Sequence, residues 1–138
     1  MFSVDVRRTP QACVFALHGE LDFDSAVQLQ EAADLALTGP RRPRLLVVDC
    51  TDLAFCDSSG IGGLIRIYQT LSAHGGVLRL AAAPGSVARV FALTGLDQVI
   101  AVHPTPQSAL SSGAGSRESG NGAAAPSTRP ARERSTGR

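Results

Sequence analysis

Apolar and polar positions follow two periods along this chain, and together they predict an alternation of strands and helices. Residues 2–7 alternate apolar and polar side chains, which is typical of a half-exposed strand, whereas residues 12–17 are apolar almost throughout, as in a strand inside a sheet. Leu45 to Val48 is a short, β-branched run that predicts another buried strand, ending near Asp49. In all, the pattern predicts five strands, over residues 2–7, 12–17, 45–49, 77–82 and 98–102.

Between these strands, apolar residues recur every three or four positions, which predicts helices that lie on a core. The first helix is expected to open at Asp24 or Ser25, because Ser25 and Gln28 have the spacing of a capping box. It is expected to end at the Gly39-Pro40 pair. Further helices are expected from Ser58 to His74, from Pro84 to Gly95 and from Thr105 onward.

The order of these elements predicts an α/β fold. It has one mixed, mostly parallel sheet of about five strands, an antiparallel strand at the N-terminal edge and about four helices. Functional sites in such sheets lie at the carboxyl ends of the parallel strands. Two loops, at residues 19–24 and 51–59, follow predicted parallel strands. Asp22 and Ser58 are therefore expected to lie on one face of the molecule.

A polar turn at residues 56–60, Cys-Asp-Ser-Ser-Gly, joins the buried strand to the second helix. The first N–H groups of a helix lack partners within it, and Asp or Ser side chains commonly cap them. A helix turns by about 100° per residue, so the apolar stripe from Ile61 to Leu71 leaves an outward side made of Ser59, Gly62, Gly63, Arg66, Gln69 and Thr70. The glycines suggest that something approaches a bare backbone closely, although glycines are also tolerated inside helices.

The composition of the chain differs between its C-terminal segment and the rest. The chain has 138 residues, a net charge of +1 and 43% hydrophobic residues, enough for the core of one domain. Residues 111–138 contain five arginines, two glutamates and no Val, Ile, Leu or aromatic residue, which predicts a disordered tail behind a domain at 1–110. That domain carries eight arginines against ten carboxylates, so no direct binding of nucleic acid is expected.

Three cysteines, Cys13, Cys50 and Cys56, adjoin apolar runs and lack metal-ligand spacing. They are expected to be small buried hydrophobic side chains in a reducing cytosol, with no metal or cofactor. The N-terminus lacks the apolar region of a signal peptide, and no run reaches the length of a membrane span. These features predict a cytoplasmic protein that does not enter a membrane.

The residues around Ser58 suggest three kinds of chemistry. A serine hydrolase is disfavoured because Cys56 and Asp57 do not fit the nucleophile elbow. A phosphate-binding loop is disfavoured because the segment around Ser58 has no lysine and lies among Asp22, Asp24 and Asp57. The third is phosphorylation of the serine itself, because a phosphoserine carries a charge of about −1.5 to −2 at pH 7. A helix N-terminus tolerates that charge, while a partner fitted to the neutral hydroxyl is repelled. Plain capping by Asp57 and Ser58 is the alternative.

Three further segments of the chain, together with this turn, form a pattern that is more specific than the turn alone. The four segments are Gly19-Glu20-Leu21-Asp22, Asp57-Ser58-Ser59-Gly60-Ile61-Gly62, the Gly75-Gly76 turn, and Val87-x-x-Val90-Phe91-x-x-Thr94-Gly95-Leu96. In their order and spacing the chain resembles the bacterial anti-sigma factor antagonists, which are single STAS domains. The resemblance covers about residues 2–110, implies a mixed β-sheet packed with several helices, and says nothing about the basic tail.

The resemblance implies a regulatory function without catalysis. In that family the serine directly after the Asp is phosphorylated by an anti-sigma factor that is also a serine kinase, and the matching residue is Ser58. The unphosphorylated antagonist binds the anti-sigma factor and releases a sigma factor, and a PP2C-like phosphatase restores it after phosphorylation. An adaptor subunit of a lipid-transport ABC complex, or a component of a stress-signalling scaffold, is the alternative.

Candidate residues for partner binding come from two sources, the family motifs and the outward side of the second helix. The motifs suggest Glu20, Asp22, Asp57, Ser58 and Ser59, and the helix suggests Gly62, Gly63, Arg66 and Ile67.

Overall fold

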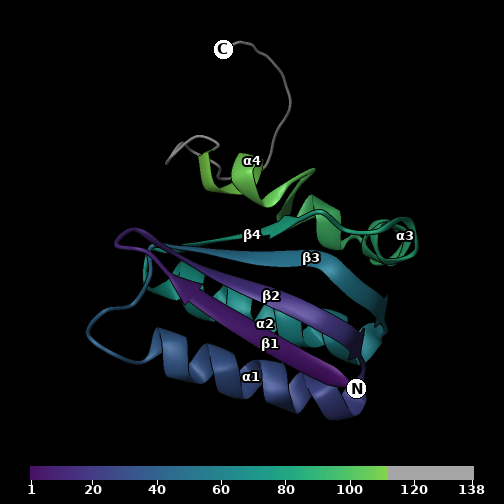
Figure 1. Ribbon diagram of the computed structural model, residues 1–138, viewed down its shortest axis with the longest axis horizontal. Coiled ribbons are helices and arrows are strands. Elements are labelled where there is room, and N and C mark those ends of the chain that lie inside the picture. Colours follow the sequence, from purple (N-terminus) through teal and green to yellow (C-terminus); the bar gives the residue numbers. More distant parts are fainter. Residues whose placement is uncertain (112–138) are drawn as a thin grey trace.

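Five strands form one sheet in the order in which they occur along the chain (Figure 1). The computed structural model describes residues 1–111. Its strands are β1 (Phe2–Arg8), β2 (Ala12–Leu21), β3 (Leu45–Cys56), β4 (Val77–Ala81) and β5 (Ala101–His103). β1 pairs with β2 in antiparallel fashion, and the remaining pairs are parallel. This arrangement confirms the predicted mixed sheet and its antiparallel N-terminal edge strand.

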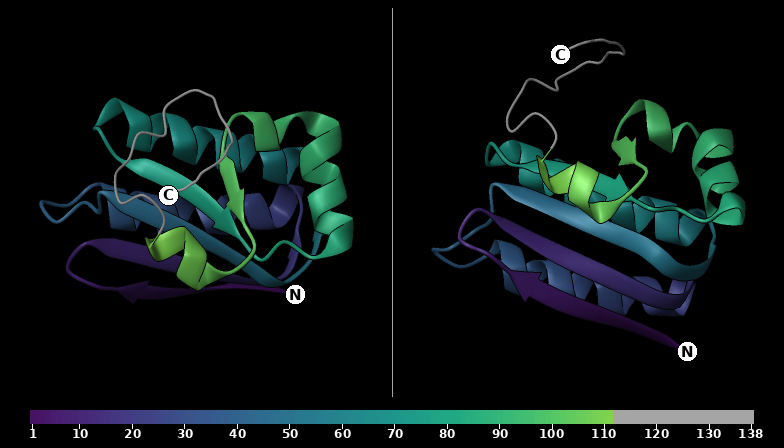
Figure 2. Two further views of the ribbon diagram at one scale, coloured as in Figure 1. Left: turned by 90° about the horizontal axis from the view of Figure 1, so that it is seen from above. Right: turned by 45° about the horizontal axis from the view of Figure 1, so that its top comes forward.

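The helices are distributed unequally over the two faces of the sheet. α1 (Phe23–Leu37) and α2 (Ser58–Ala73) lie side by side on one face, and α4 (Pro106–Ser111) lies on the other (Figures 1 and 2). α3 (Gly85–Thr94) and a short 3-10 turn, η1 (Leu96–Gln98), connect β4 to β5. α3 lies beyond the end of the sheet where β3 turns into α2 (Figure 1).

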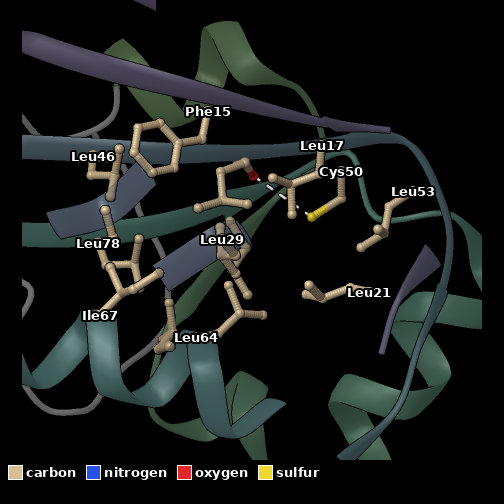
Figure 3. Packing of buried hydrophobic residues seen from close by; sticks show 14 of the residues in the cluster. Phe15, Leu17, Leu21, Leu29, Leu46, Cys50, Leu53, Leu64, Ile67 and Leu78 are labelled. Carbon is tan, nitrogen blue, oxygen red and sulfur yellow. Dashed lines mark hydrogen bonds between the residues drawn. The ribbon is translucent and has the colours of Figure 1, made fainter. Parts of the chain in front are cut away.

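The main core fills the space between the sheet and the layer of α1 and α2. Alternate residues of the central strands point into it, including Phe15 of β2 and Leu46 of β3 (Figure 3). Leu29 of α1 and Leu64 of α2 pack against them, and all four side chains are fully buried. Burial of a side chain of this size contributes about 1.5–3 kcal/mol, so this layer holds both helices firmly on the sheet.

β2 and β3 are both longer than the sequence pattern predicts. β2 extends to Leu21 and β3 continues past Asp49 to Cys56, so residues 19–21 and 51–56 of the two predicted loops belong to strands. The two strands remain paired through register shifts near His18 and after Gly19. Gly19 has a φ of +97°, and a Cβ there would overlap the carbonyl oxygen of Met1, so glycine is required. The shifts break the two-residue period and hide the extension from pattern analysis.

α1 begins earlier than predicted because its cap is Asp22. The Asp22 carboxylate accepts the N–H of Ser25 at 3.0 Å, and the Ser25 hydroxyl accepts the N–H of Asp22 at 2.7 Å. The predicted start at Asp24 or Ser25 and the predicted Ser25–Gln28 capping box are therefore wrong. The last strand also differs from the prediction for residues 98–102, since the chain first forms η1 and β5 begins at Ala101.

α4 builds a small second core on the opposite face of the sheet. Ala109 packs there with Val14, Val47 and Ala81 of three neighbouring strands. Arg79 of β4 is buried under this helix, and its Nη1 donates to the carbonyl oxygen of Ala109 at 2.7 Å. The hydrogen bond fixes α4 on the sheet.

The predicted disordered tail was expected to start at Ser111, which is the last residue of α4. Residues 112–138, which make up the rest of that tail, lie outside the described residues. Among the helices of residues 1–111, none combines the length and apolar character that a membrane crossing requires.

Candidate functional site

The carboxyl ends of β2 and β3 lie next to each other, and each strand passes directly into a helix. Their last residues, Leu21 and Cys56, are register partners. One residue further along, the N–H of Asp57 donates to the carbonyl oxygen of Leu21 at 3.2 Å. α1 and α2 therefore start from the same edge of the sheet, and Asp22 and Ser58 share a face as the sequence predicts.

Asp22 is fixed at the start of α1 by the hydrogen bonds of its capping box. These bonds lower the pKa of the Asp22 carboxyl, first through the backbone N–H of Ser25 and then through its hydroxyl. The Ser25 hydroxyl also lies 2.6 Å from the carbonyl oxygen of Glu20, to which it can donate. The backbone of residues 20–25 is thus held in one conformation, with the Glu20 side chain exposed beside it.

Asp57 caps α2 in a similar way. Its Oδ1 accepts the N–H of Ser59 at 2.9 Å and the N–H of Gly60 at 3.1 Å. Ser58 stands between these groups as the first residue of the helix, and it is exposed. Within residues 1–111 no group forms a hydrogen bond with its hydroxyl, so the Ser58 oxygen faces solvent without a competing partner.

Gly60 allows the first turn of α2 to lie directly on the end of β2. A Cβ at this position would be 2.8 Å from Cγ of Leu21, 2.9 Å from Sγ of Cys56 and 2.9 Å from the carbonyl oxygen of Leu21. These distances are shorter than van der Waals contact, so a side chain here would push the helix away from the strand. The position of Ser58 relative to Asp22 depends on this contact.

The charge at this end of the sheet is negative. Its carboxylates are Glu20, Asp22, Asp24, Asp52 and Asp57, and no arginine occurs between residues 45 and 65 or between residues 9 and 40. α3, which lies beyond the same end, adds one exposed arginine, Arg89. Arg66 lies two turns further along α2, where its Nε donates to Oε1 of Gln30 at 3.4 Å. A phosphate added to Ser58 would therefore join an already acidic surface.

Fewer of the residues predicted on the outward side of α2 are accessible than the sequence suggests. Arg66 is exposed and Gly62 has open space around it, in agreement with the prediction. Gly63 is buried, however, and a Cβ added to it would lie 3.9 Å from Cδ2 of Leu29. Ile67 is fully buried in the core (Figure 3). Both were expected on the outward side, but Gly63 faces α1 and Ile67 belongs to the main core.

Exposed apolar side chains border the acidic residues, and the sequence analysis did not select them. Phe23 of α1 is 74% exposed, Val27 one turn later is 57% exposed, and Phe55, which pairs with Glu20 across the strands, is 48% exposed. Phe23 could have been noticed as an aromatic residue outside the core stripe of its helix. These side chains give the acidic end an apolar rim of the kind found in protein interfaces.

Nothing near Ser58 in the described part of the chain activates it as a nucleophile. The ring of His18 lies between Asp5 and Asp52 at 3.1 and 3.2 Å, on the strands. Burial, with a smaller effect of the Asp57 charge, raises the pKa of Cys56 to about 12, so this thiol is protonated at neutral pH. The described residues also include no group of three or more His, Cys, Asp or Glu side chains that could hold a metal ion.

Comparison with known proteins gives the following similarities. The sequence model of one protein family, the STAS domain, matches residues 3–109. The anti-sigma-F factor antagonist RsfA of Mycobacterium tuberculosis is 27% identical over 106 residues, which cover 77% of this chain and 83% of RsfA. The anti-sigma-B factor antagonist of Bacillus subtilis is 29% identical over 99 residues, covering 71% of this chain and 87% of that protein.

Among solved structures, an anti-sigma factor antagonist from Mycobacterium paratuberculosis superposes with a TM-score of 0.72 at 27% sequence identity. The match covers 80% of this chain and 92% of the other. Sequence and structure comparisons therefore agree on the same kind of domain over the part of the chain that forms the sheet and its helices.

Proposed function

Because the chain belongs to the STAS domain family, we propose that it is an anti-sigma factor antagonist controlled by phosphorylation of Ser58. In the unphosphorylated state it binds an anti-sigma factor that is also a serine kinase, and a sigma factor is released. Phosphorylation of Ser58 by that kinase ends the binding, and a PP2C-like phosphatase restores it. Since the partners act on transcription, the proposal places the protein in the cytoplasm and assigns it no catalysis of its own.

One observation carries the proposal: the Ser58 hydroxyl is exposed and unbonded at the start of a helix whose other first N–H groups are already capped. A kinase can reach such a hydroxyl without unfolding the domain. The added charge lies beside the Asp57 carboxylate and at the same edge as Asp22, so it changes the surface potential where a partner would bind.

The proposed contact surface consists of exposed or half-buried groups at this edge. It includes Glu20, Asp22, Asp57, Ser58, Ser59, Gly62 and Arg66, with Phe23, Val27 and Phe55 as its apolar part. Aromatic side chains commonly dominate the binding energy of an interface, so Phe23→Ser is expected to weaken partner binding more strongly than Glu20→Gln.

The test is the intact mass of the protein after incubation with ATP and a candidate anti-sigma kinase from the same genome. We expect one added phosphate on the wild type and none on Ser58→Ala. Binding of the same anti-sigma factor should be lost in Ser58→Asp. It should be kept in the matched variant Ser72→Asp, which adds the same charge to an exposed serine at the far end of α2, roughly 20 Å away.

Two outcomes contradict the proposal in different ways. If the anti-sigma factor binds but Ser58 acquires no phosphate, the protein is an adaptor without this switch. If no anti-sigma factor of that genome binds, the partner belongs to another system, and the STAS adaptor of a lipid-transport ABC complex or of a stress-signalling scaffold becomes the next candidate.

A further inference from the structure

A second surface lies at the opposite end of the sheet from Ser58. It is formed by the end of β1, the connection from α1 to β3 and the end of α2, which are far apart in sequence (Figure 1). α2 runs from Ser58 to the edge of this surface, and its 16 residues span roughly 24 Å, at about 1.5 Å per residue. A molecule of modest size bound at one end would therefore not touch the other.

Two adjoining hollows occupy this surface. The first has a volume of about 320 Å³, and its lining includes Pro40, Pro43, Arg42, Arg44 and His74. Leu37 and Leu71 also line it but are almost fully buried, whereas Pro40 is exposed and Pro43 half-buried. The volume of this hollow lies within the range of binding pockets. The lining therefore offers two proline rings for apolar contact and the charges of two arginines.

The second hollow, of about 280 Å³, is lined by Arg8, Arg41 and Leu35. Pro40 lines both hollows, so they adjoin each other at the α1–β3 connection, and the two together are called the groove here. Leu35 is 81% exposed, which leaves a large apolar side chain open to solvent beside two guanidinium groups. Each of the two hollows thus combines apolar residues with arginines.

The arginines of the groove are not neutralised by the described part of the chain. Arg8 donates to the carbonyl oxygen of Arg41 at 3.4 Å, and no carboxylate of residues 1–111 forms an ion pair with Arg8, Arg41, Arg42 or Arg44. The last turns of α1 and α2 contain no basic residue. The four arginines therefore do not belong to a helix C-terminus, where a positive charge would stabilise the helix dipole. Their charge is available to a ligand.

We propose that this groove binds an acidic peptide segment of a second protein, one that carries a leucine-like side chain between carboxylates. Arginine guanidinium groups pair with carboxylates in bidentate fashion, and the apolar lining takes the intervening side chain. The rest of the domain repels such a segment, because residues 1–110 carry ten carboxylates against four arginines outside the groove. Within residues 1–110, binding is therefore directed to this end, independently of the state of Ser58.

Other anionic surfaces fit the groove less well. Single-stranded nucleic acid is usually bound by stacking on several aromatic side chains beside a basic track, and among the lining residues of the two hollows the imidazole of His74 is the single aromatic ring. An anionic membrane is flat on this scale, whereas the arginines border a concave surface with one protruding apolar side chain, Leu35. An acidic peptide can enter the hollows and reach the arginines at the same time.

The experiment measures fluorescence anisotropy of a labelled peptide of alternating aspartate and leucine, added to the full chain at low salt. We expect saturable binding that weakens as salt is raised. Arg42→Glu and Arg44→Glu should each weaken it about tenfold, since each reversal replaces an attraction by a repulsion. The matched control Arg89→Glu makes the same charge change in α3, outside the groove, and should keep the wild-type affinity.

Further variants separate this surface from the Ser58 site. Ser58→Asp should bind the peptide as the wild type does, and a peptide with serine in place of leucine should bind several-fold more weakly. The proposal is overturned if no saturable binding occurs or if Arg89→Glu weakens binding as much as Arg42→Glu. It is also overturned if duplex DNA or phosphatidylserine vesicles bind more tightly than the peptide with the same dependence on Arg42 and Arg44.

Discussion

Replacing Gly60 or Gly62 with alanine should change stability in opposite directions, although the two glycines lie in the same turn of α2. Alanine is favoured over glycine inside a helix by about 0.5–1 kcal/mol. At Gly62 the new methyl group meets no heavy atom within 4 Å, so the whole gain is expected. Gly62→Ala should therefore raise the free energy of unfolding by about 0.5–1 kcal/mol.

At Gly60 the same methyl group would lie 2.8–2.9 Å from three atoms. One of them is the carbonyl oxygen of Leu21, which accepts the N–H of Asp57 and cannot retreat without weakening that bond. Overpacking of this kind costs about 1–3 kcal/mol, which exceeds the gain in helix propensity. Gly60→Ala should lower the free energy of unfolding by about 1–2 kcal/mol, and the two variants should differ by about 2–3 kcal/mol.

Urea denaturation, followed by circular dichroism, measures this difference directly, and Gly62→Ala serves as the matched control for Gly60→Ala. If both variants stabilise the protein to the same extent, the first turn of α2 does not lie on β2 as described. The same pair also tests the proposed interface. Because Gly62→Ala is expected to be more stable than the wild type, any loss of anti-sigma binding in this variant would not come from unfolding. Binding should weaken only if the partner approaches the bare backbone at position 62.

Three further predictions concern the cap, the core and pH. Asp57→Ala should lower the free energy of unfolding by about 0.5–2 kcal/mol, because two helix N–H groups lose their acceptor, and Asp57→Ser should recover part of the loss in urea denaturation. Ile67→Ala should cost about 2–5 kcal/mol, as expected of a core position, and a change near zero in the thermal midpoint would show that Ile67 is on the surface after all. Burial, aided by the charge of Arg79, lowers the pKa of His103 to about 4, so the unfolded chain takes up a proton between pH 6.5 and 4 that the folded chain does not. Stability should therefore fall on the order of 1–2 kcal/mol as pH drops through this window, after allowance for partial exposure, and His103→Gln should remove that part of the pH dependence of urea midpoints.

The order of elements and the place of Ser58 could be predicted from the sequence because both depend on local signals. The change from an apolar run to a helical stripe at Asp57 marks a strand-to-helix turn wherever the rest of the chain lies. The neighbouring position of Asp22 follows from topology, since parallel strands end at one edge. These parts of the fold could be predicted without knowing how the helices pack on the sheet.

The features that were missed or misassigned depend on contacts between distant segments. Gly63 and Ile67 fall on or near the polar side of a helical wheel, but α1 covers Gly63 through Leu29, and Ile67 is buried in the main core. Gly60 and Gly62 look alike in sequence, and only the end of β2 distinguishes them. The arginine groove is similarly invisible, because Arg8 joins residues 41–44 only when β1 and the α1–β3 connection meet.

The position of Ser58 also explains how a phosphate could switch binding while the fold stays intact. A phosphate of charge near −2 at about 5 Å from the Asp57 carboxylate, in a solvent-exposed setting, costs roughly 1–2 kcal/mol. The positive end of α2 and the N–H of Ser58, which no described residue engages, offset a cost of about this size. The free energy of unfolding should therefore change little. A partner whose surface had matched the Ser58 hydroxyl, by contrast, would meet two like charges with less water to screen them, so nearly all of the effect falls on binding.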